Sequence, residues 1–247
     1  APHSLRTVSP KSLKEIKESI PFVPIHLHIS EQQKEVEDFQ YKFGKRPVNW
    51  LLDNFLVDSS WCLVHATHML SEETAKFANS GAIAGLCPIT EANLGDGIFD
   101  GSKYVACGGK FGIGTDSNVH ISLTEELRML EYSQRLILNE RNVMTNNSGS
   151  SGEFLYKSAV SGGSQALSRN SGSIACGHWA DLVAIDSTNI AFYESSKDEI
   201  LDRWIFSAND SLVREVWSAG RKMVDDGRHI KHDQIERQYR KIMSDFF

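Results

Sequence analysis

Short apolar runs that alternate with helix-like stretches constrain the fold of this chain more than any other sequence feature. Residues 31–43 and 71–80 have helical composition, and each of these stretches lies between two successive apolar runs. Ser122 and Glu125 form a capping-box pattern that opens a further helix. Strands that alternate with helices build βαβ units and a parallel sheet. We therefore predict an α/β fold with strands at residues 22–29, 61–66, 82–86 and 111–115.

The C-terminal part of the sequence has a different character. Residues 146–152 (NNSGSSG) predict a flexible loop, and residues 161–177 are rich in Ser and Gly. Residues 180–185 predict one strand, and residues 213–227 predict two strands joined near Gly220. The charged stretch 230–247 predicts a terminal helix. The expected layout is an α/β portion, then a small β portion, then a helix.

Composition excludes several classes of partner. The 247 residues carry 26 basic and 32 acidic side chains, a net charge of -6 and a pI near 5.9, which disfavours a nucleic-acid or anionic-membrane surface. No apolar run approaches the roughly 18–20 residues needed to cross a bilayer. The cysteines form no CxxC pattern, which argues against a thiolate zinc site and a disulfide framework. Reduced thiols indicate a cytoplasmic protein.

Ionisable side chains stand where the predicted strands end, which is where parallel α/β folds place their sites. His26 and His28 lie two residues apart on one strand and share a face, and Glu31 follows them. His65 ends the next run, and Asp116 follows the last. Imidazole and carboxylate groups bind a divalent metal such as zinc or iron, and an uncoordinated carboxylate moves protons. These residues predict a catalytic metal site.

Each of these residues also has a purely structural interpretation. A single histidine on an apolar strand is more often a hydrogen-bonded residue of the core or surface. Asp116 alone is equally well a turn or cap residue, and His65 can simply begin the loop before a helix. The order of the residues favours the site: an HxxE motif, a histidine and an aspartate, each at a strand end.

That order of motifs resembles the order found in the amidohydrolase superfamily. His28-Ile29-Ser30-Glu31, then His65, then Thr115-Asp116-Ser117 is similar to the signature of its one-metal deaminase branch. Within that branch, further strings resemble the family of N-formimino-L-glutamate deiminases of histidine breakdown. The similarity covers nearly the whole chain and includes residues 47–52 (PVNWLL), 87–99 (CPITEANLGDGIF), 126–136 (ELRMLEYSQRL), 177–185 (GHWADLVAI) and 216–229 (VWSAGRKMVDDGRH).

The resemblance implies a fold. Residues 1–165 would form the C-terminal half of a (β/α)8 metal-dependent hydrolase barrel, from its fourth or fifth strand to its eighth. Residues 166–228 would form part of a small β-sandwich domain, and residues 229–247 a terminal helix. A complete barrel of this kind needs roughly 250 residues. We therefore expect the chain to be a C-terminal fragment of a larger enzyme.

The resemblance also implies roles for individual residues. His28 and Asp116 would bind one divalent metal, with zinc as the first expectation and iron as the alternative that the same ligands accept. Glu31 would be the proton shuttle, and His65 would polarise the substrate, so that Glu31, His65 and Asp116 are the catalytic residues. The loop that carries His3 and Arg6 would hold the carboxylates of a small dicarboxylate substrate, and the enzyme would be a homodimer. The reaction would release ammonia and N-formyl-L-glutamate.

One departure leaves alternatives open. The HxH pair that the superfamily's first strand adds to the metal site has no match ahead of His28-Ile29-Ser30-Glu31. The chain by itself is then equally interpretable as a non-catalytic fragment. Another deaminase of the branch, acting on a purine or pteridine, remains an alternative. A bimetallic hydrolase of the dihydroorotase type would need a bridging Lys near the N-terminus, and residues 1–10 contain none.

Overall fold

The predicted parallel sheet is present in the computed structural model, which describes residues 1–21, 23–145, 149–196 and 199–246. Its strands follow the order β1-β2-β3-β4 and pair in parallel, with Leu27 opposite Leu63 in the first pair. The four predicted strands are confirmed, the first three with shorter bounds and the fourth shifted to begin at Lys110; Phe22 of the first run lies outside the described residues. The strands are β1 (Ile25–Ile29), β2 (Trp61–His65), β3 (Ile83–Leu86) and β4 (Lys110–Ile113).

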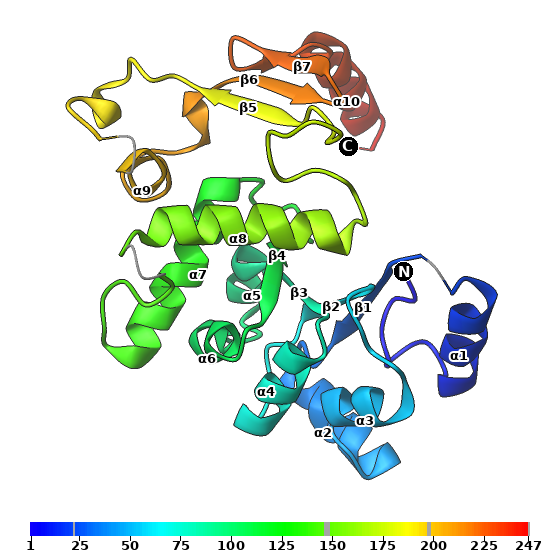
Figure 1. Ribbon diagram of the computed structural model, residues 1–247. Helices are drawn as coiled ribbons and strands as arrows, with labels where there is room; N and C mark the ends of the chain where they lie inside the picture. Colours follow the sequence, from blue (N-terminus) through cyan, green and yellow to red (C-terminus); the bar gives the residue numbers. More distant parts are fainter. Residues whose placement is uncertain (22, 146–148, 197–198, 247) are drawn as a thin grey trace.

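One face of the sheet packs against the helices that surround it, and the other carries histidines and meets the helix of residues 151–166 at His26. Ile25, Leu27 and Ile29 are buried against the helices that follow or precede the strands, and these residues form the main core. His26 and His28 alternate with them and point to the opposite face. Figure 1 shows the surrounding helices α1 (Pro10–Ser19), α2 (Gln33–Phe43), α3 (Pro47–Asn54), α4 (Ser71–Asn79), α5 (Pro88–Leu94) and α6 (Gly101–Ala106).

Two long helices follow the last parallel strand. Ser122 caps α7 (Leu123–Leu138) by accepting a hydrogen bond from the backbone N–H of Glu125 at 3.2 Å, so the predicted start of this helix is confirmed. The spacing i, i+4 and i+7 predicts an apolar face of Leu123, Leu127 and Leu130. Leu127 and Leu130 are buried, but Leu123, in the first turn, is exposed. The next helix, α8 (Ser151–Ala166), packs across β4 and β3 (Figure 1).

Helix α8 corrects two sequence predictions. Residues 146–148 of the predicted loop lie outside the described residues, but Ser151 and Gly152 already belong to α8, as does the first part of the Ser- and Gly-rich stretch. Its glycines serve close packing rather than flexibility. A Cβ at Gly162 would lie 1.9 Å from the carbonyl oxygen of Phe111 on β4, and one at Gly152 would lie 2.6 Å from the backbone nitrogen of Asp202.

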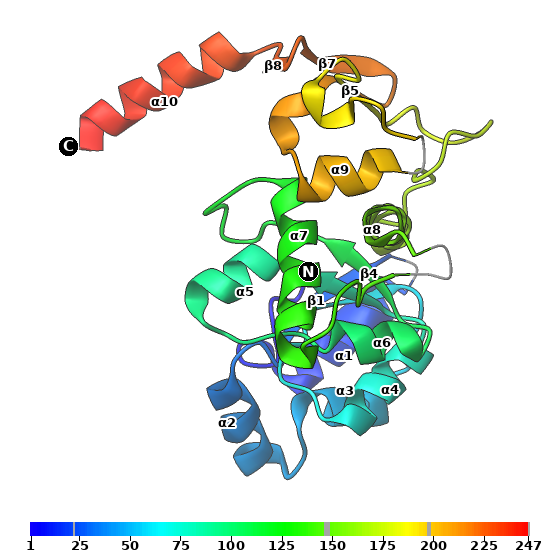
Figure 2. The same ribbon diagram turned by 90° about the vertical axis from the view of Figure 1, so that its left-hand side faces the viewer.

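A separate antiparallel sheet follows, in the order β5-β6-β7-β8. The two strands predicted within residues 213–227 are confirmed, and they turn through Ala219 and Gly220, both with positive φ. Figure 2 shows this sheet above α9 and α7. The elements are β5 (Leu182–Ile185), a 3₁₀ turn (Ile190–Phe192), α9 (Ile200–Phe206), a 3₁₀ turn (Asp210–Leu212), β6 (Val213–Ser218), β7 (Arg221–Asp225) and β8 (Arg228–His229).

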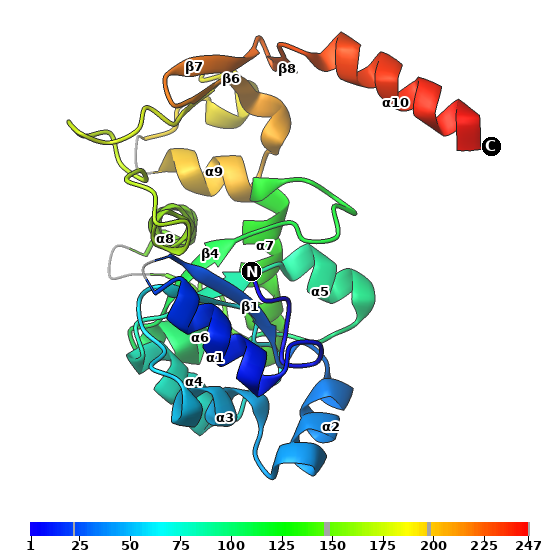
Figure 3. The same ribbon diagram turned by 90° about the vertical axis from the view of Figure 1, so that its right-hand side faces the viewer.

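The predicted terminal helix is confirmed as α10 (His232–Phe246), and Phe247 lies outside the described residues. It extends away from the rest of the chain, as Figures 2 and 3 show, and none of its described residues is buried. Among the described residues, no helix has both the length and the apolar character to cross a membrane.

Candidate active site

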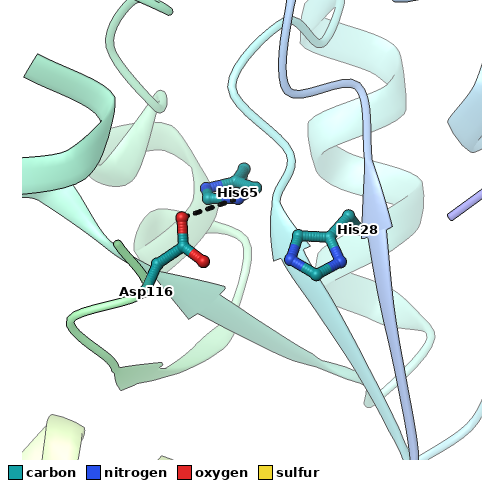
Figure 4. A group of neighbouring side chains, drawn as sticks. All are labelled: His28, His65 and Asp116. Carbon is teal, nitrogen blue, oxygen red and sulfur yellow. Dashed lines mark ion pairs between the residues drawn. The ribbon is translucent and has the colours of Figure 1, made fainter. Parts of the chain in front are cut away.

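The carboxyl ends of three parallel strands bring together His28, His65 and Asp116. Each residue offers one nitrogen or oxygen atom, and the three atoms lie within 4.8 Å of one another (Figure 4). The His28 and His65 ring centroids are 5.3 Å apart, and His65 Nε2 lies 4.0 Å from Asp116 Oδ2. His28 is the last residue but one of β1, His65 ends β2, and Asp116 follows β4, so the parallel sheet itself creates this cluster.

The backbone adopts left-handed conformations where these strands end. Ser30, His65, Ala66 and Asp116 have φ values of 50°, 67°, 49° and 47°. Such conformations cost of order 1–3 kcal/mol for residues other than glycine and persist where surrounding contacts impose them. Backbone hydrogen bonds fix the turn after β2: Ala66 N–H donates to Ile29 at 3.0 Å, and His68 N–H donates to Ser30 at 2.9 Å. Strain of this kind concentrates at functional sites.

His28 is held by the N-terminal segment. The backbone of Ser4 bridges in parallel to His28, and the His28 N–H donates to the His3 carbonyl at 2.8 Å. The same carbonyl lies 2.8 Å from His28 Nδ1, and the rings of His3 and His28 stack with centroids 4.9 Å apart. A carbonyl oxygen can only accept, so Nδ1 carries the proton and Nε2 is free to bind a ligand.

His65 is completely buried between carboxylates. Its Nδ1 lies 3.2 Å from Glu91 Oε1 on α5, and its Nε2 lies 3.8 Å from Glu31 Oε1. Burial lowers the pKa of His65, but the surrounding carboxylates together raise it overall, and Glu91 contributes most through its hydrogen bond and its charge. The charges of Glu31 and Asp116 act in the same direction. His65 Nε2 has no hydrogen-bond partner among the described residues, so it is a buried polar atom aimed at the site.

Glu31 forms an ion pair with Arg6, which the resemblance predicts to bind the substrate's carboxylates. Arg6 donates to Glu31 Oε2, and its Nε lies 4.0 Å from Glu35 Oε2. Glu35 itself accepts the backbone N–H groups of Ser30 at 3.0 Å and Glu31 at 2.9 Å, which fixes the turn after β1. The structure therefore places Arg6 beside the expected proton shuttle, with a third of its side chain exposed.

A second buried carboxyl group stands behind the site. Glu126 on α7 accepts the backbone N–H of Ile89 at 2.9 Å through Oε2, at the start of α5. Its Oε1 is buried and has no partner among the residues described. Burial, assisted by the charge of Glu91, raises the pKa of Glu126 to about 7. Glu126 thus holds the N-terminal turn of α5, from which Glu91 reaches His65.

Glu35, Glu91 and Glu126 are the residues that the sequence reasoning missed. Each lies within the first turn of a helix. Acidic residues are common there because they suit the helix dipole, so position alone gives no functional signal. The available signal was weaker: Glu35 stands a few residues after the strand that carries His28, and Glu91 stands a few residues after β3, the neighbour of the strand that His65 ends.

His26 lies apart from this cluster. Its Nε2 is 2.8 Å from the carbonyl oxygen of Ala166, the last residue of α8. His26 and His28 share a face as predicted, but His26 joins the sheet to α8 and does not point at the same ligand. Another possible metal-binding group, His232, Asp233 and Glu236, lies on exposed α10, where both acidic residues pair with arginines.

The donor set at the sheet edge fits a divalent metal. Two imidazole groups and a carboxylate are ligand types that zinc and iron accept, and the unpartnered Nε2 of His65 shows that the site has unused binding capacity. The second carboxylate at the site, Glu31, stays available for proton transfer.

Fold and site together define a class: an α/β protein whose parallel sheet carries a histidine–aspartate cluster of metal-binding type at its carboxyl edge. The chain belongs to the amidohydrolase family, whose profile matches residues 1–223. It is 45% identical over 245 residues to the formimidoylglutamate deiminase of Pseudomonas aeruginosa. This alignment covers 98% of the chain and 54% of the relative. The predicted superfamily is therefore confirmed, and within it the chain is similar to a deiminase.

Other relatives agree on the fold. An amidohydrolase from Brucella melitensis superimposes with a TM-score of 0.93 at 48% identity, over 99% of this chain and 54% of its own. An adenosine deaminase from Xanthomonas campestris, solved with bound zinc, gives a TM-score of 0.85 at 24% identity, over 98% and 56%. The 5'-deoxyadenosine deaminase of Methanopyrus kandleri is 28% identical over 95% of this chain and 54% of its own. The chain thus spans about half the length of the curated relatives it matches.

Proposed function

We propose that this chain belongs to a metal-dependent hydrolytic deiminase that converts N-formimino-L-glutamate to N-formyl-L-glutamate and ammonia in histidine degradation. One observation carries the proposal: the carboxylates of Glu31 and Asp116, which follow two other strands, both face the unpartnered Nε2 of His65. The 45% identity to a formimidoylglutamate deiminase supports the choice of substrate. We further propose a cytoplasmic homodimer.

In this proposal, residues 1–165 are part of a (β/α)8 barrel, residues 166–228 are part of a β-sandwich domain, and residues 229–247 are a terminal helix. The parallel order β1-β2-β3-β4 and the antiparallel order β5-β6-β7-β8 support this division. So does the position of the site at the carboxyl edge of the parallel strands, which is where barrel enzymes carry their active sites.

We assign the metal to His28 and Asp116, with zinc as the first choice and iron as the alternative. The zinc in the structure of the Xanthomonas campestris relative supports this choice. A bound divalent ion would lower the pKa of a coordinated water toward neutrality. The carbonyl of His3 holds Nδ1 of His28, so Nε2 would be the nitrogen that binds the metal.

The chain's own carboxylates move the protons. Asp116 orients the attacking water and accepts its proton at a carboxylate oxygen. As the water oxygen bonds to the formimino carbon and the C=N double bond becomes single, Glu31 relays the proton that Asp116 accepted to the substrate nitrogen. Glu31 then relays the remaining proton of the former water, now on the hydroxyl group of the intermediate, to the same nitrogen. The carbonyl group forms, the carbon–nitrogen bond breaks to release ammonia, and both carboxylates return to their starting state. His65 stabilises the charge that develops on the substrate. Because His65 is fully buried, that interaction acts in a water-excluded environment.

The substrate's carboxylates are assigned to His3 and Arg6. The planar guanidinium of Arg6 suits a carboxylate, and its bond to Glu31 shows that it can bind one at this position. A second candidate is a purine-type deaminase, favoured by the 28% identity to a 5'-deoxyadenosine deaminase. A panel of formimino amino acids and nucleosides, assayed for ammonia, separates the two. Ammonia from nucleosides alone would replace the first proposal by the second.

Replacement of Glu31 by Gln in the full-length protein tests the mechanism. We expect ammonia release to fall by about 10³-fold or more, because the amide cannot carry the proton, while the metal content stays normal. Glu37→Gln is the matched control, since Glu37 is an exposed residue of α2 that contacts Gln33. An active Glu31→Gln enzyme would overturn the assignment of the proton shuttle.

A further inference from the structure

The two histidines of the site are held in the same way by different partners. His28 Nδ1 faces the neutral carbonyl of His3, and His65 Nδ1 faces the carboxylate of Glu91. In each ring this leaves Nε2 as the nitrogen available to the site. His3 lies on the N-terminal segment and is exposed, whereas Glu91 is 4% exposed and lies in the first turn of α5.

The surroundings of Glu91 determine which group donates. Glu91 Oε1 already accepts the backbone N–H of Cys87 at 3.0 Å, and the same oxygen lies 3.2 Å from His65 Nδ1. A carboxylate oxygen accepts hydrogen bonds and has no proton to donate, so the proton between Glu91 Oε1 and His65 belongs to Nδ1. The start of α5 is fixed in turn by the bond between Glu126 and the Ile89 N–H.

Without Glu91, the buried ring of His65 has a competing arrangement. Its Nε2 lies 3.8 Å from Glu31 Oε1 and 4.0 Å from Asp116 Oδ2, so a small rotation with a proton on Nε2 would create a hydrogen bond to either carboxylate. That arrangement would occupy the nitrogen that faces the site. It would also bind a carboxylate that the reaction uses.

We propose that Glu91 is a positioning residue that fixes the proton of His65 on Nδ1 and holds the ring so that Nε2 faces the reacting atoms. The inference rests on the proposed function for its kinetic consequence, but the position of the proton does not depend on it. Glu91 acts through His65 and has no contact with the substrate. His65 and His28 then differ in the partner of Nδ1, which is a carboxylate for His65 and an uncharged carbonyl for His28.

The kinetic experiment uses the metal-loaded, full-length protein. We expect Glu91→Gln to lower kcat about 10-fold, because its amide oxygen can still accept from Nδ1, and Glu91→Leu to lower kcat by about 100-fold or more. The KM and the metal content should change less than about twofold in both. The control is Glu131→Gln, a buried carboxylate of α7 that binds Arg135 and two loop N–H groups away from the site. Normal kcat in Glu91→Leu would overturn the proposal.

The second experiment measures directly which ring nitrogen of His65 carries the proton. Nitrogen-15 NMR of histidine-labelled, metal-free protein, with His65 assigned by its loss in His65→Asn, should show Nδ1 protonated in the wild type. Glu91→Leu should move that proton wholly or partly to Nε2. A wild-type spectrum with the proton on Nε2 would overturn the proposal even if Glu91 variants are inactive. If the wild type releases no ammonia from N-formimino-L-glutamate, the proposed function fails while this spectrum still tests Glu91.

Discussion

The carboxyl edge of the parallel sheet and the antiparallel sheet of β5 to β8 both carry ion pairs, but these differ in burial. The side chains of Arg46 and Glu73, which brace the loop after β2, are 17% and 1% exposed. Those of Arg169 and Asp181, beside β5, are 33% and 31% exposed. Further along the antiparallel sheet, Lys222 and its partner Glu215 are similarly accessible.

The difference in burial shows that the charges whose burial costs stability lie at the carboxyl edge of the parallel sheet. A buried charge must be matched by partners, because removal of one partner leaves the other uncompensated and costs about 3–5 kcal/mol. An exposed pair contributes little, since water solvates each member alone. Four of the buried carboxylates, those of Glu31, Glu35, Glu91 and Glu126, lie around the candidate site, which is consistent with charge retained there for chemistry rather than for stability.

The strongest test of this comparison is Arg46→Met. Arg46 donates to Glu73 Oε2 at 2.7 Å and to the His68 carbonyl at 2.7 Å, so its loss leaves a buried carboxylate and a carbonyl without their partner. We expect the free energy of unfolding, measured with urea, to fall by about 3 kcal/mol. Lys45→Met is the matched control, because Lys45 pairs with Asp53 on the surface and its loss should change little. Equal losses in both variants would contradict the comparison.

A smaller effect is expected for Glu126→Gln, and it should depend on pH. The pKa of Glu126 is raised from 4.5 to about 7 in the fold, so the unfolded chain ionises first and the wild type loses stability between those two pH values. The loss amounts to at most about 3 kcal/mol. Gln keeps an acceptor for the Ile89 N–H and cannot ionise.

Urea unfolding of the wild type and Glu126→Gln at several pH values from 4.5 to 8 measures this effect. The variant should gain on the wild type as the pH rises through this range and keep its advantage at pH 8. Parallel stability curves for the two proteins would show that Glu126 ionises in the fold as it does in the unfolded chain.

Much of the parallel region could be predicted from the sequence because its signals are local. The apolar runs gave the strands, and Ser122 with Glu125 gave the start of α7. Strand ends in a parallel sheet meet at one edge, so His28, His65 and Asp116 could be expected together before any coordinates were known. The pairing of Arg6 with Glu31 was not expected, since Arg6 stands 25 residues away in the sequence.

What could not be predicted depends on contacts distant in sequence. The glycines of α8 indicated a loop, because only the approach of the helix to Phe111 shows that Gly162 has no space for a Cβ. Glu91 and Glu126 looked like ordinary helix-terminus acids until their distances to His65 and Ile89 were known. The left-handed turn at His65 likewise has no sequence marker, since the position is not glycine.

The smallest effect is expected for Arg169→Met, which tests the exposed side of the comparison. Arg169 donates to both oxygens of Asp181, at 2.7 and 2.9 Å, and lies over the Trp179 ring. The hydrogen bond from Arg169 is the main reason that the pKa of Asp181 falls to about 2, with the Ala219 N–H adding to it. We expect the variant to raise this pKa toward its ordinary value, as carboxyl carbon-13 NMR would measure.

Despite the strong geometry of this pair, Arg169→Met should leave the unfolding free energy at pH 7 almost unchanged, because solvent screens both charges. The contribution of a depressed aspartate pKa is present above its unfolded value and is lost as the pH falls toward 2, so any difference should shrink in acid. A loss as large as that of Arg46→Met would mean that burial does not separate the two regions. The buried carboxylates around His65 would then need another explanation than chemistry.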